Sequence, residues 1–279
     1  YAVLQFNRPD VLYDVPKMLM SSYGPLALKW NYIPKMFKWF LHYFKNCNHN
    51  SMMHTAKNMH QILSLSNDAY EEIFQEIDTA GLVEKKGIIY IWTNKNLKSR
   101  NLEIKVRKEL GIQQKLLTQK EVLDLEPNLQ PVFDAGVIYE SAMHARDPHG
   151  ILKKIFKLYL ERGGKFIQTN IKNLRQTSNY ETVIRSENEE YKFEKTVVAS
   201  GAFSKALTDQ LGENIPLDTE RGYHVHFKGK DHLITRPVIF LDRGFGMTPM
   251  NQGLRAVGTV ELGGLKNPPS KKRIDYIIK

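Results

Sequence analysis

The stretch from Thr196 to Phe227 most constrains what this chain can fold into. It opens with a short apolar run, Val197 to Ala199, which ends at the small residues Ser200, Gly201 and Ala202. An apolar run closed by small residues predicts a buried strand whose carboxyl end another molecule can approach closely. Ligands of open α/β sheets collect outside the carboxyl ends of strands, so this turn is a candidate binding site.

The second half of the same stretch predicts a helix and another strand. We expect the helix from Ser204 to Leu211, ended by Gly212, and the strand from Arg221 to Phe227, after Pro216 has blocked further helix. A glycine at one strand end and an Arg-Gly-Tyr-His strand nearby are typical of a site for an anionic small molecule. An ordinary sheet edge with turn glycines explains the local pattern equally well.

Composition favours a globular α/β protein of one or two domains. The 279 residues are 42% hydrophobic and 25% charged, and the formal net charge is +10. That charge favours anionic partners, but the lysines are scattered, with Lys271 to Arg273 the densest cluster, so a solvated surface is preferred over nucleic-acid binding. The single cysteine, Cys47, excludes an internal disulfide and a cysteine-based metal site, which fits a reducing compartment.

One helix prediction leaves two environments open. Between Lys35 and Lys45, aromatic and aliphatic side chains alternate with lysines at helical spacing. A helix this apolar and edged with lysine suits burial in the fold, or else the interface of a membrane. His54 and His60 lie six residues apart and cannot share a helical face as metal ligands, so no metal site is predicted.

The remaining elements are predicted from periodicity, caps and turns. Before residue 145 we expect a loop at 1–28 and strands at 87–92 and 135–140. Helices are expected at 51–80, with a break near Ser66 and an end at Gly81, and at 97–110. A further short helix is expected to start with a capping box at Thr118. After it we expect a helix capped by Asp147, strands at 165–168 and 171–175, and a hairpin of 181–185 with 191–193. This order predicts the second half of an α/β nucleotide-type domain with an inserted hairpin.

Arg221, Tyr223 and His224 together could supply what an amino- or hydroxy-carboxylate needs. Arginine presents a planar donor fork to a carboxylate, tyrosine adds a neutral donor, and histidine exchanges a proton near neutral pH. On a regular strand Arg221 and Tyr223 face one side and His224 the other. The phosphate-binding, zinc-protease, serine-hydrolase and dinucleotide motifs are not found in the sequence.

Three longer strings give the chain a family resemblance. VVASGAFS at 197–204, PLDTERGYHV at 216–225 and GLRAVGTVE at 253–261 make it similar to the dehydrogenase branch of the FAD-dependent D-amino-acid oxidase family, and the likeness runs through most of the chain. The resemblance implies a mixed α/β (α+β) fold: a partial FAD-binding Rossmann-like domain and a mixed-sheet substrate domain. We assign residues 1–145 and 213–279 to the substrate domain and 146–212 to the FAD domain.

The resemblance also implies roles for individual residues. FAD would contact five of them: Ile171, Ala199, Ser200, Gly201 and Ala202. Arg221, Tyr223 and His224 are the substrate-side candidates, and His224 and His144 the candidate general bases. The oxidases of the family have an arginine where this chain has Met250, which places more weight on Arg221 and less on Arg243 or Arg255.

Two parts of the family pattern are not found. These are the amino-terminal strand, glycine loop and helix for the FAD pyrophosphate and the carboxy-terminal flavin loop. Because a βαβ unit takes about 30 residues, we expect the chain to be a fragment that binds FAD weakly or not at all.

The expected function is FAD-dependent oxidative deamination of D-amino acids by hydride transfer from Cα to the flavin. Electrons would pass to a respiratory acceptor. We expect a small-molecule partner, no nucleic-acid partner and a cytoplasmic location, with peripheral contact to the inner membrane or a quinone-linked acceptor left open. One alternative is a sarcosine- or glycine-type oxidase of the same family. The other is a basic module that binds membranes or nucleic acid.

Overall fold

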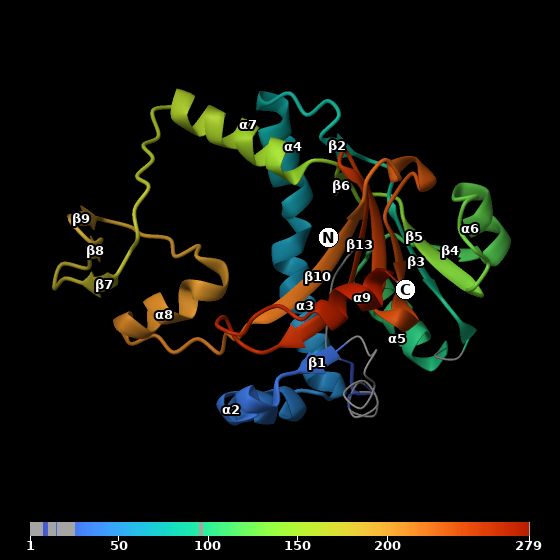
Figure 1. The fold of residues 1–279 in the computed structure, drawn as a ribbon, viewed down its shortest axis with the longest axis horizontal. Helices are drawn as coiled ribbons and strands as arrows, with labels where there is room; N and C mark the ends of the chain where they lie inside the picture. Colours follow the sequence, from blue (N-terminus) through green and yellow to red (C-terminus); the bar gives the residue numbers. More distant parts are fainter. Residues whose placement is uncertain (1–7, 11–14, 16–25, 95–96, 279) are drawn as a thin grey trace.

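A mixed eight-stranded sheet forms the centre of the fold (Figure 1). The computed structural model describes residues 8–10, 15, 26–94 and 97–278, so most of the predicted loop at 1–28 lies outside the described residues. The strands run in the order β1, β13, β12, β11, β3, β5, β4, and β10 also pairs with β13. Their bounds are β1 Leu26–Leu28, β3 Ile88–Trp92, β4 Lys115–Thr118, β5 Ala135–Tyr139, β10 Glu220–Phe227, β11 Val238–Phe240, β12 Phe245–Met250 and β13 Gly253–Leu262.

The sheet confirms the predicted mixed α/β fold. β1 runs parallel to β13, and β3 runs parallel to β11, while the remaining pairs in the sheet are antiparallel. Strands from before residue 145 and from after residue 213 are therefore neighbours in one sheet. The loop prediction is wrong at residues 26–28, because the backbone of this segment pairs with the end of β13.

Helices cover both faces of the sheet and create two apolar cores. On one face Met52 and Ala56 of α3 (His49–Ser64) and Val106 of α5 (Leu97–Glu109) pack against Tyr90 and Tyr139. On the other face, α6 (Gln119–Leu125) contributes its buried Val122 to a second core with residues of β3 and β11. Because β3 lies between these cores, all five of its residues are buried, which explains its continuous apolar sequence.

The other helices are α2 (Ile33–Lys45), α4 (Ser66–Glu76), α7 (Pro148–Glu161), α8 (Ser204–Thr208) and α9 (Lys271–Ile278). The break near Ser66 and the capping box of Thr118 with Glu121 are confirmed. Asp147 caps α7 by accepting a hydrogen bond from the Gly150 amide at 3.0 Å. Gly81 does not close α4, because that helix already ends at Glu76. Within the described ranges, no helix is both long and apolar enough to cross a membrane.

Residues 162–219 depart from the predicted nucleotide-type half-domain. The hairpin is confirmed as β8 (Thr182–Arg185) and β9 (Glu190–Phe193), and β7 (Asn173–Gln176) completes a separate three-stranded antiparallel sheet. In Figure 1 this sheet and α8 stand apart from the large sheet. The strands predicted at 165–168 and 197–199 are wrong: neither segment pairs with a described strand, and Val197 is 88% exposed. An apolar run becomes a strand only where a neighbouring strand satisfies its backbone.

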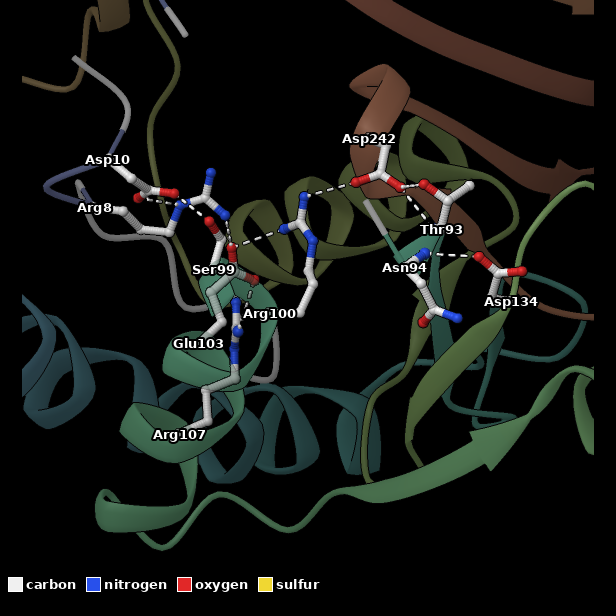
Figure 2. A network of polar contacts seen from close by, with 10 residues as sticks. All are labelled: Arg8, Asp10, Thr93, Asn94, Ser99, Arg100, Glu103, Arg107, Asp134 and Asp242. Atoms are coloured by element: carbon white, nitrogen blue, oxygen red, sulfur yellow. Dashed lines mark hydrogen bonds and ion pairs between the residues drawn. The ribbon is translucent and has the colours of Figure 1, made fainter. Parts of the chain in front are cut away.

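A buried polar network ties α5 to the start of β12 (Figure 2). Glu103 accepts hydrogen bonds from the guanidinium groups of Arg8, Arg100 and Arg107. Arg100 also donates to Asp242, which accepts two further hydrogen bonds from the amide and hydroxyl of Thr93. The network fixes the turn before β12, which in turn pairs with β13.

A second small sheet lies beside α7. It pairs β2 (Val83–Glu84) with β6 (His144–Ala145) in antiparallel register. Arg146 follows β6 and donates to Glu84 and Asp231, each at 3.0 Å, which holds this corner against the large sheet.

Candidate functional site

The pairing of β10 with β13 determines where the predicted substrate residues lie. The strands are antiparallel along their length, but the register shifts between Gly222 and Tyr223. Gly222 lies opposite Val260 and Tyr223 lies opposite Gly258, so Thr259 is an additional residue in β13. Thr259 is buried and adopts a φ of 62°, which is unusual for a β-branched residue. The bulge separates Arg221 from the regular part of the strand pair.

Arg221 faces a buried carboxylate. Its Nη1 donates to Oε1 of Glu261 at 3.4 Å, and Lys29 Nζ lies 3.5 Å from the other oxygen. The Glu261 side chain is only 2% exposed, so the two cations supply the charge that its burial requires. One donor of Arg221 is therefore already committed to Glu261, while the rest of its guanidinium is partly exposed.

Tyr223 is part of the packing between β10 and α9. The side chain is buried with Ala256 and Ile277, and its hydroxyl accepts a hydrogen bond from the Ser270 amide at 2.8 Å. The hydroxyl points away from His224, because consecutive residues of a strand face opposite sides. The structure therefore does not bring Arg221, Tyr223 and His224 to one point.

His224 belongs to a cluster that the sequence analysis did not assemble. His224 Nδ1 lies 3.5 Å from Nη2 of Arg255, and the rings of His224 and His226 are 5.3 Å apart. Arg255 lies directly opposite His226 across the strand pair. The i, i+2 spacing of the two histidines on a predicted strand could have indicated a shared face. The sequence analysis named Arg255 as an alternative arginine, but its place beside the histidines depends on the strand register. We call His224, His226 and Arg255 the histidine–arginine cluster.

The electrostatics of this cluster favour neutral imidazole. Partial desolvation lowers the pKa of His224 below its ordinary value, and Arg255 and His226 lower it further. Nδ1 of His226 and Nε of Arg255 are both buried and, within the described part of the chain, have no hydrogen-bond partner. Unsatisfied buried polar atoms are rare in proteins and indicate a missing water or ligand. The cluster therefore contains two buried polar atoms whose hydrogen-bonding capacity the described residues leave unused.

The second candidate base, His144, lies in another place. It is buried on β6 and lines a cavity of about 360 Å3 between α4 and α7, with apolar neighbours such as Phe74 and Leu152. Burial lowers the pKa of His144, and neighbouring Arg146 lowers it as well, against the opposing effect of Glu84. His224 does not line this cavity, so the two histidines do not form one acid–base pair.

The alternative arginine, Arg243, lies at a larger cavity of about 910 Å3. Its guanidinium is 5.2 Å from the centre of the Phe240 ring. Phe227, Leu254 and other apolar residues line the cavity. Phe227 follows His226 in β10 and Leu254 precedes Arg255 in β13, and consecutive residues of a strand face opposite sides. The cavity therefore lies on the face of the sheet opposite the histidine–arginine cluster. Met250 is buried at the end of β12. Of the candidate arginines, only Arg255 therefore shares a face with the histidines.

Comparison with known proteins gives this geometry a family. The family described as DAO, FAD dependent oxidoreductase, matches residues 18–279. The chain belongs to this family. It is 29% identical over 278 residues to a D-amino-acid oxidase of Bradyrhizobium diazoefficiens, covering 99% of the chain and 66% of that relative. It is 24% identical over 289 residues to a D-amino acid dehydrogenase of Vibrio atlanticus, covering 97% and 67%.

The family fold is also found among solved structures. Glycine oxidase from Geobacillus kaustophilus superimposes with a TM-score of 0.65 at 18% identity, covering 80% of this chain and 60% of that one. The chain thus spans about two thirds of the length of the curated relatives that it matches.

The residues predicted to hold the FAD of this oxidoreductase family are accessible but do not enclose a site. Ala199 to Ala202 are exposed, and a side chain built on Gly201, whose φ is 54°, would meet open space. Ile171 precedes β7 and is half-buried. The cavities described above are lined by neither Gly201 nor Arg221. Because neither cavity includes Gly201, the FAD contacts predicted at this turn stay predictions.

Proposed function

We propose that this chain functions in an FAD-dependent dehydrogenase. The enzyme oxidises D-amino acids to imino acids, which water then hydrolyses to keto acids and ammonia. The observation that carries the proposal is the histidine–arginine cluster, where two buried polar atoms have no hydrogen-bond partner among the described residues. Membership of the FAD-dependent oxidoreductase family supports the oxidation, and the two relatives support a D-amino acid as substrate.

In this proposal Arg255 binds the substrate carboxylate. Arginine binds a carboxylate through two parallel hydrogen bonds, and the unpartnered Nε of Arg255 together with an Nη group provides such a pair of donors. Arg255 has no carboxylate partner in the described ranges, whereas Arg221 is paired with Glu261. Arg255 thus replaces Arg221, which the sequence favoured, as the first choice for this role.

His224 is the proposed proton acceptor. Removal of a hydride from Cα requires the amine of the substrate to be neutral, so the ammonium must lose a proton on binding. The lowered pKa keeps the imidazole of His224 neutral near pH 7 and able to take this proton. The FAD of the family, when bound, supplies the electron-accepting chemistry for the hydride.

The final electron acceptor separates two forms of the proposal. We favour a respiratory acceptor, with quinone-linked transfer as the specific expectation, because several relatives are named dehydrogenases. A glycine- or sarcosine-type oxidase of the same family would pass the electrons to dioxygen and release hydrogen peroxide. Arg255 and His224 would have the same roles in both.

The test uses the flavin-loaded enzyme that contains this sequence. Initial rates are measured with D- and L-amino acids and glycine, with an artificial electron acceptor and, separately, with a peroxide assay. Loss of a charge-assisted hydrogen bond costs about 1.5–3 kcal/mol, so Arg255→Met should lower kcat/KM for D-amino acids about 10- to 100-fold. Arg243→Met, the same change on the other face of the sheet, is the control and should keep wild-type kinetics. Wild-type kinetics in Arg255→Met, or activity on L-amino acids alone, would contradict the proposal.

A further inference from the structure

The outward face of α2 carries an apolar stripe beside a basic one. Phe37, Leu41 and Phe44 follow the i, i+4, i+7 spacing that places side chains on one helix face. The next residue after each of these is basic: Lys38, His42 and Lys45. The exposed fractions are 60% for Phe37, 55% for Leu41 and 43% for Phe44, and the preceding Trp30 is 77% exposed. We call these apolar residues, together with Lys35, Lys38 and Lys45, the α2 surface.

The opposite face of α2 is attached to the fold, so the α2 surface has a fixed outward orientation. Met36 is fully buried, and the Trp39 and Tyr43 rings stack with centres 5.2 Å apart. At the start of the helix, the Tyr32 hydroxyl donates to Asp218 at 3.0 Å. Rotation of α2 to bury Phe37 and Leu41 would therefore expose Met36 and break this anchor.

Within the described residues, the lysines of the α2 surface are not neutralised by carboxylates. Residues 30–45 contain three lysines and no aspartate or glutamate. In the part of the chain that the structure describes, Lys35, Lys38 and Lys45 have no carboxylate within ion-pair distance. Lys35 lies over the Tyr32 ring, 5.9 Å from its centre. An apolar stripe with an adjoining row of free cations complements a surface that is apolar beneath and anionic on top.

We propose that the α2 surface binds the face of a lipid bilayer that contains anionic lipids. The helix lies parallel to the bilayer, Phe37, Leu41 and Phe44 enter the boundary between headgroups and acyl chains, and Lys38 and Lys45 contact lipid phosphates. The exposed Trp30 suits the interfacial region, where tryptophan is enriched. This interaction surface is independent of the proposed oxidation.

A second copy of the chain fits the α2 surface less well than a bilayer does. A symmetric dimer places the same patch on both partners, so the two rows of lysines would lie near each other across the interface. Like charges brought together in this way oppose association. A bilayer with anionic headgroups offers charges of the opposite sign along the full length of the helix.

The experiment is co-sedimentation of the full chain with vesicles of phosphatidylcholine alone and of phosphatidylcholine mixed with phosphatidylglycerol. We expect binding to the anionic vesicles that weakens as salt rises. Each basic residue near an anionic surface contributes about a fivefold factor, so Lys38→Glu/Lys45→Glu should weaken binding by at least about 25-fold. Leu41→Glu should weaken it about tenfold, because an apolar group no longer enters the bilayer.

Matched controls separate the α2 surface from the net charge and from exposed apolar residues in general. Lys120→Glu/Lys153→Glu makes the same change in charge at exposed lysines of α6 and α7. Leu116→Glu replaces a leucine that is 58% exposed on β4. Both controls should bind anionic vesicles like the unchanged chain, and circular dichroism should show the same fold in every variant.

Three results would overturn the proposal: no binding to anionic vesicles, equal binding to neutral ones, or equal losses in the control variants. If the chain does not bind vesicles, and light scattering shows a dimer that the Leu41→Glu substitution dissociates, the α2 surface binds a second copy of the chain instead. Because none of these substitutions touches the histidine–arginine cluster, amino-acid oxidation in vesicle-free solution should not change. Failure of one proposal is thus distinguishable from failure of the other.

Discussion

Replacement of Glu103 should strongly destabilise the fold. It accepts hydrogen bonds from Arg8 at 2.5 Å, Arg100 at 2.9 Å and Arg107 at 3.3 Å, and the last two side chains are almost fully buried (Figure 2). Glu103→Gln keeps the shape and removes the charge, so two buried guanidinium groups lose their shared counterion. Breaking a buried pair from one side costs about 3–5 kcal/mol. Arg100 retains Asp242 at 3.2 Å, which places the expected loss near the lower end, about 3 kcal/mol.

Urea unfolding at neutral pH, followed by circular dichroism, measures this loss as a lower midpoint. Glu109→Gln is the matched control on the same helix, because its pair with Lys105 at 3.8 Å is exposed and should contribute less than about 0.5 kcal/mol. In an Arg107→Met background the effect of Glu103→Gln should shrink by about 1 kcal/mol or more, since one of the guanidinium groups that Glu103 binds has been removed. A loss below about 1 kcal/mol for Glu103→Gln, or equal losses for it and Glu109→Gln, would refute the argument that burial makes this network essential.

Three further predictions concern the histidines and the caps. Arg255→Gln should raise the pKa of His224 in an NMR titration, because a neighbouring cation is removed, whereas Arg243→Gln should leave it unchanged. The buried His144 has a lowered pKa, so the unfolded chain binds the proton more readily and stability should fall as pH drops below the ordinary value of about 6.5. His144→Phe should reduce this loss in urea midpoints compared at about pH 7.5 and about pH 5.5, and exposed His49→Gln should not. Asp147→Ala should lower stability by about 1 kcal/mol and Asp147→Asn by less, since asparagine still caps α7; equal losses would count against the cap.

Elements specified by local chemistry were predictable from the sequence. The capping box of Thr118 with Glu121 and the Asp147 cap each depend on residues within one helical turn, and both formed as expected. β3 was also predictable, because a continuous apolar run of β-branched and aromatic residues needs burial on both faces. The strand predicted at 197–199 failed for the complementary reason. Its apolar composition is suitable, but a strand depends on a neighbour that the composition of the segment itself does not specify.

The candidate site was only partly predictable. Arg221, Tyr223 and His224 are close in sequence, and the sequence analysis made all three substrate-side candidates while expecting His224 on the other face of the strand. The structure assigns them to a buried ion pair, to packing against α9 and to the histidine–arginine cluster, respectively. Strand alternation separates Tyr223 from His224, and the bulge at Thr259 sets Arg221 apart from both. The register between β10 and β13 brings Arg255 to the histidines, and register is determined by the packed sheet rather than by any local motif.

The two charged residues that β13 carries, Arg255 and Glu261, show how a structural charge can be told from a functional one. Glu261 is buried but lies between two cations, Arg221 and Lys29, so its charge is balanced by the protein itself. Among the described residues, the side-chain hydrogen-bond contact of Arg255 is with the His224 ring, and its Nε is buried without a partner. A buried donor left unpaired costs about 1–3 kcal/mol, and an anion bound beside it would recover that free energy. Of the two charges, Arg255 is therefore the one whose environment a bound anion would complete, which is why we propose that it binds the substrate carboxylate.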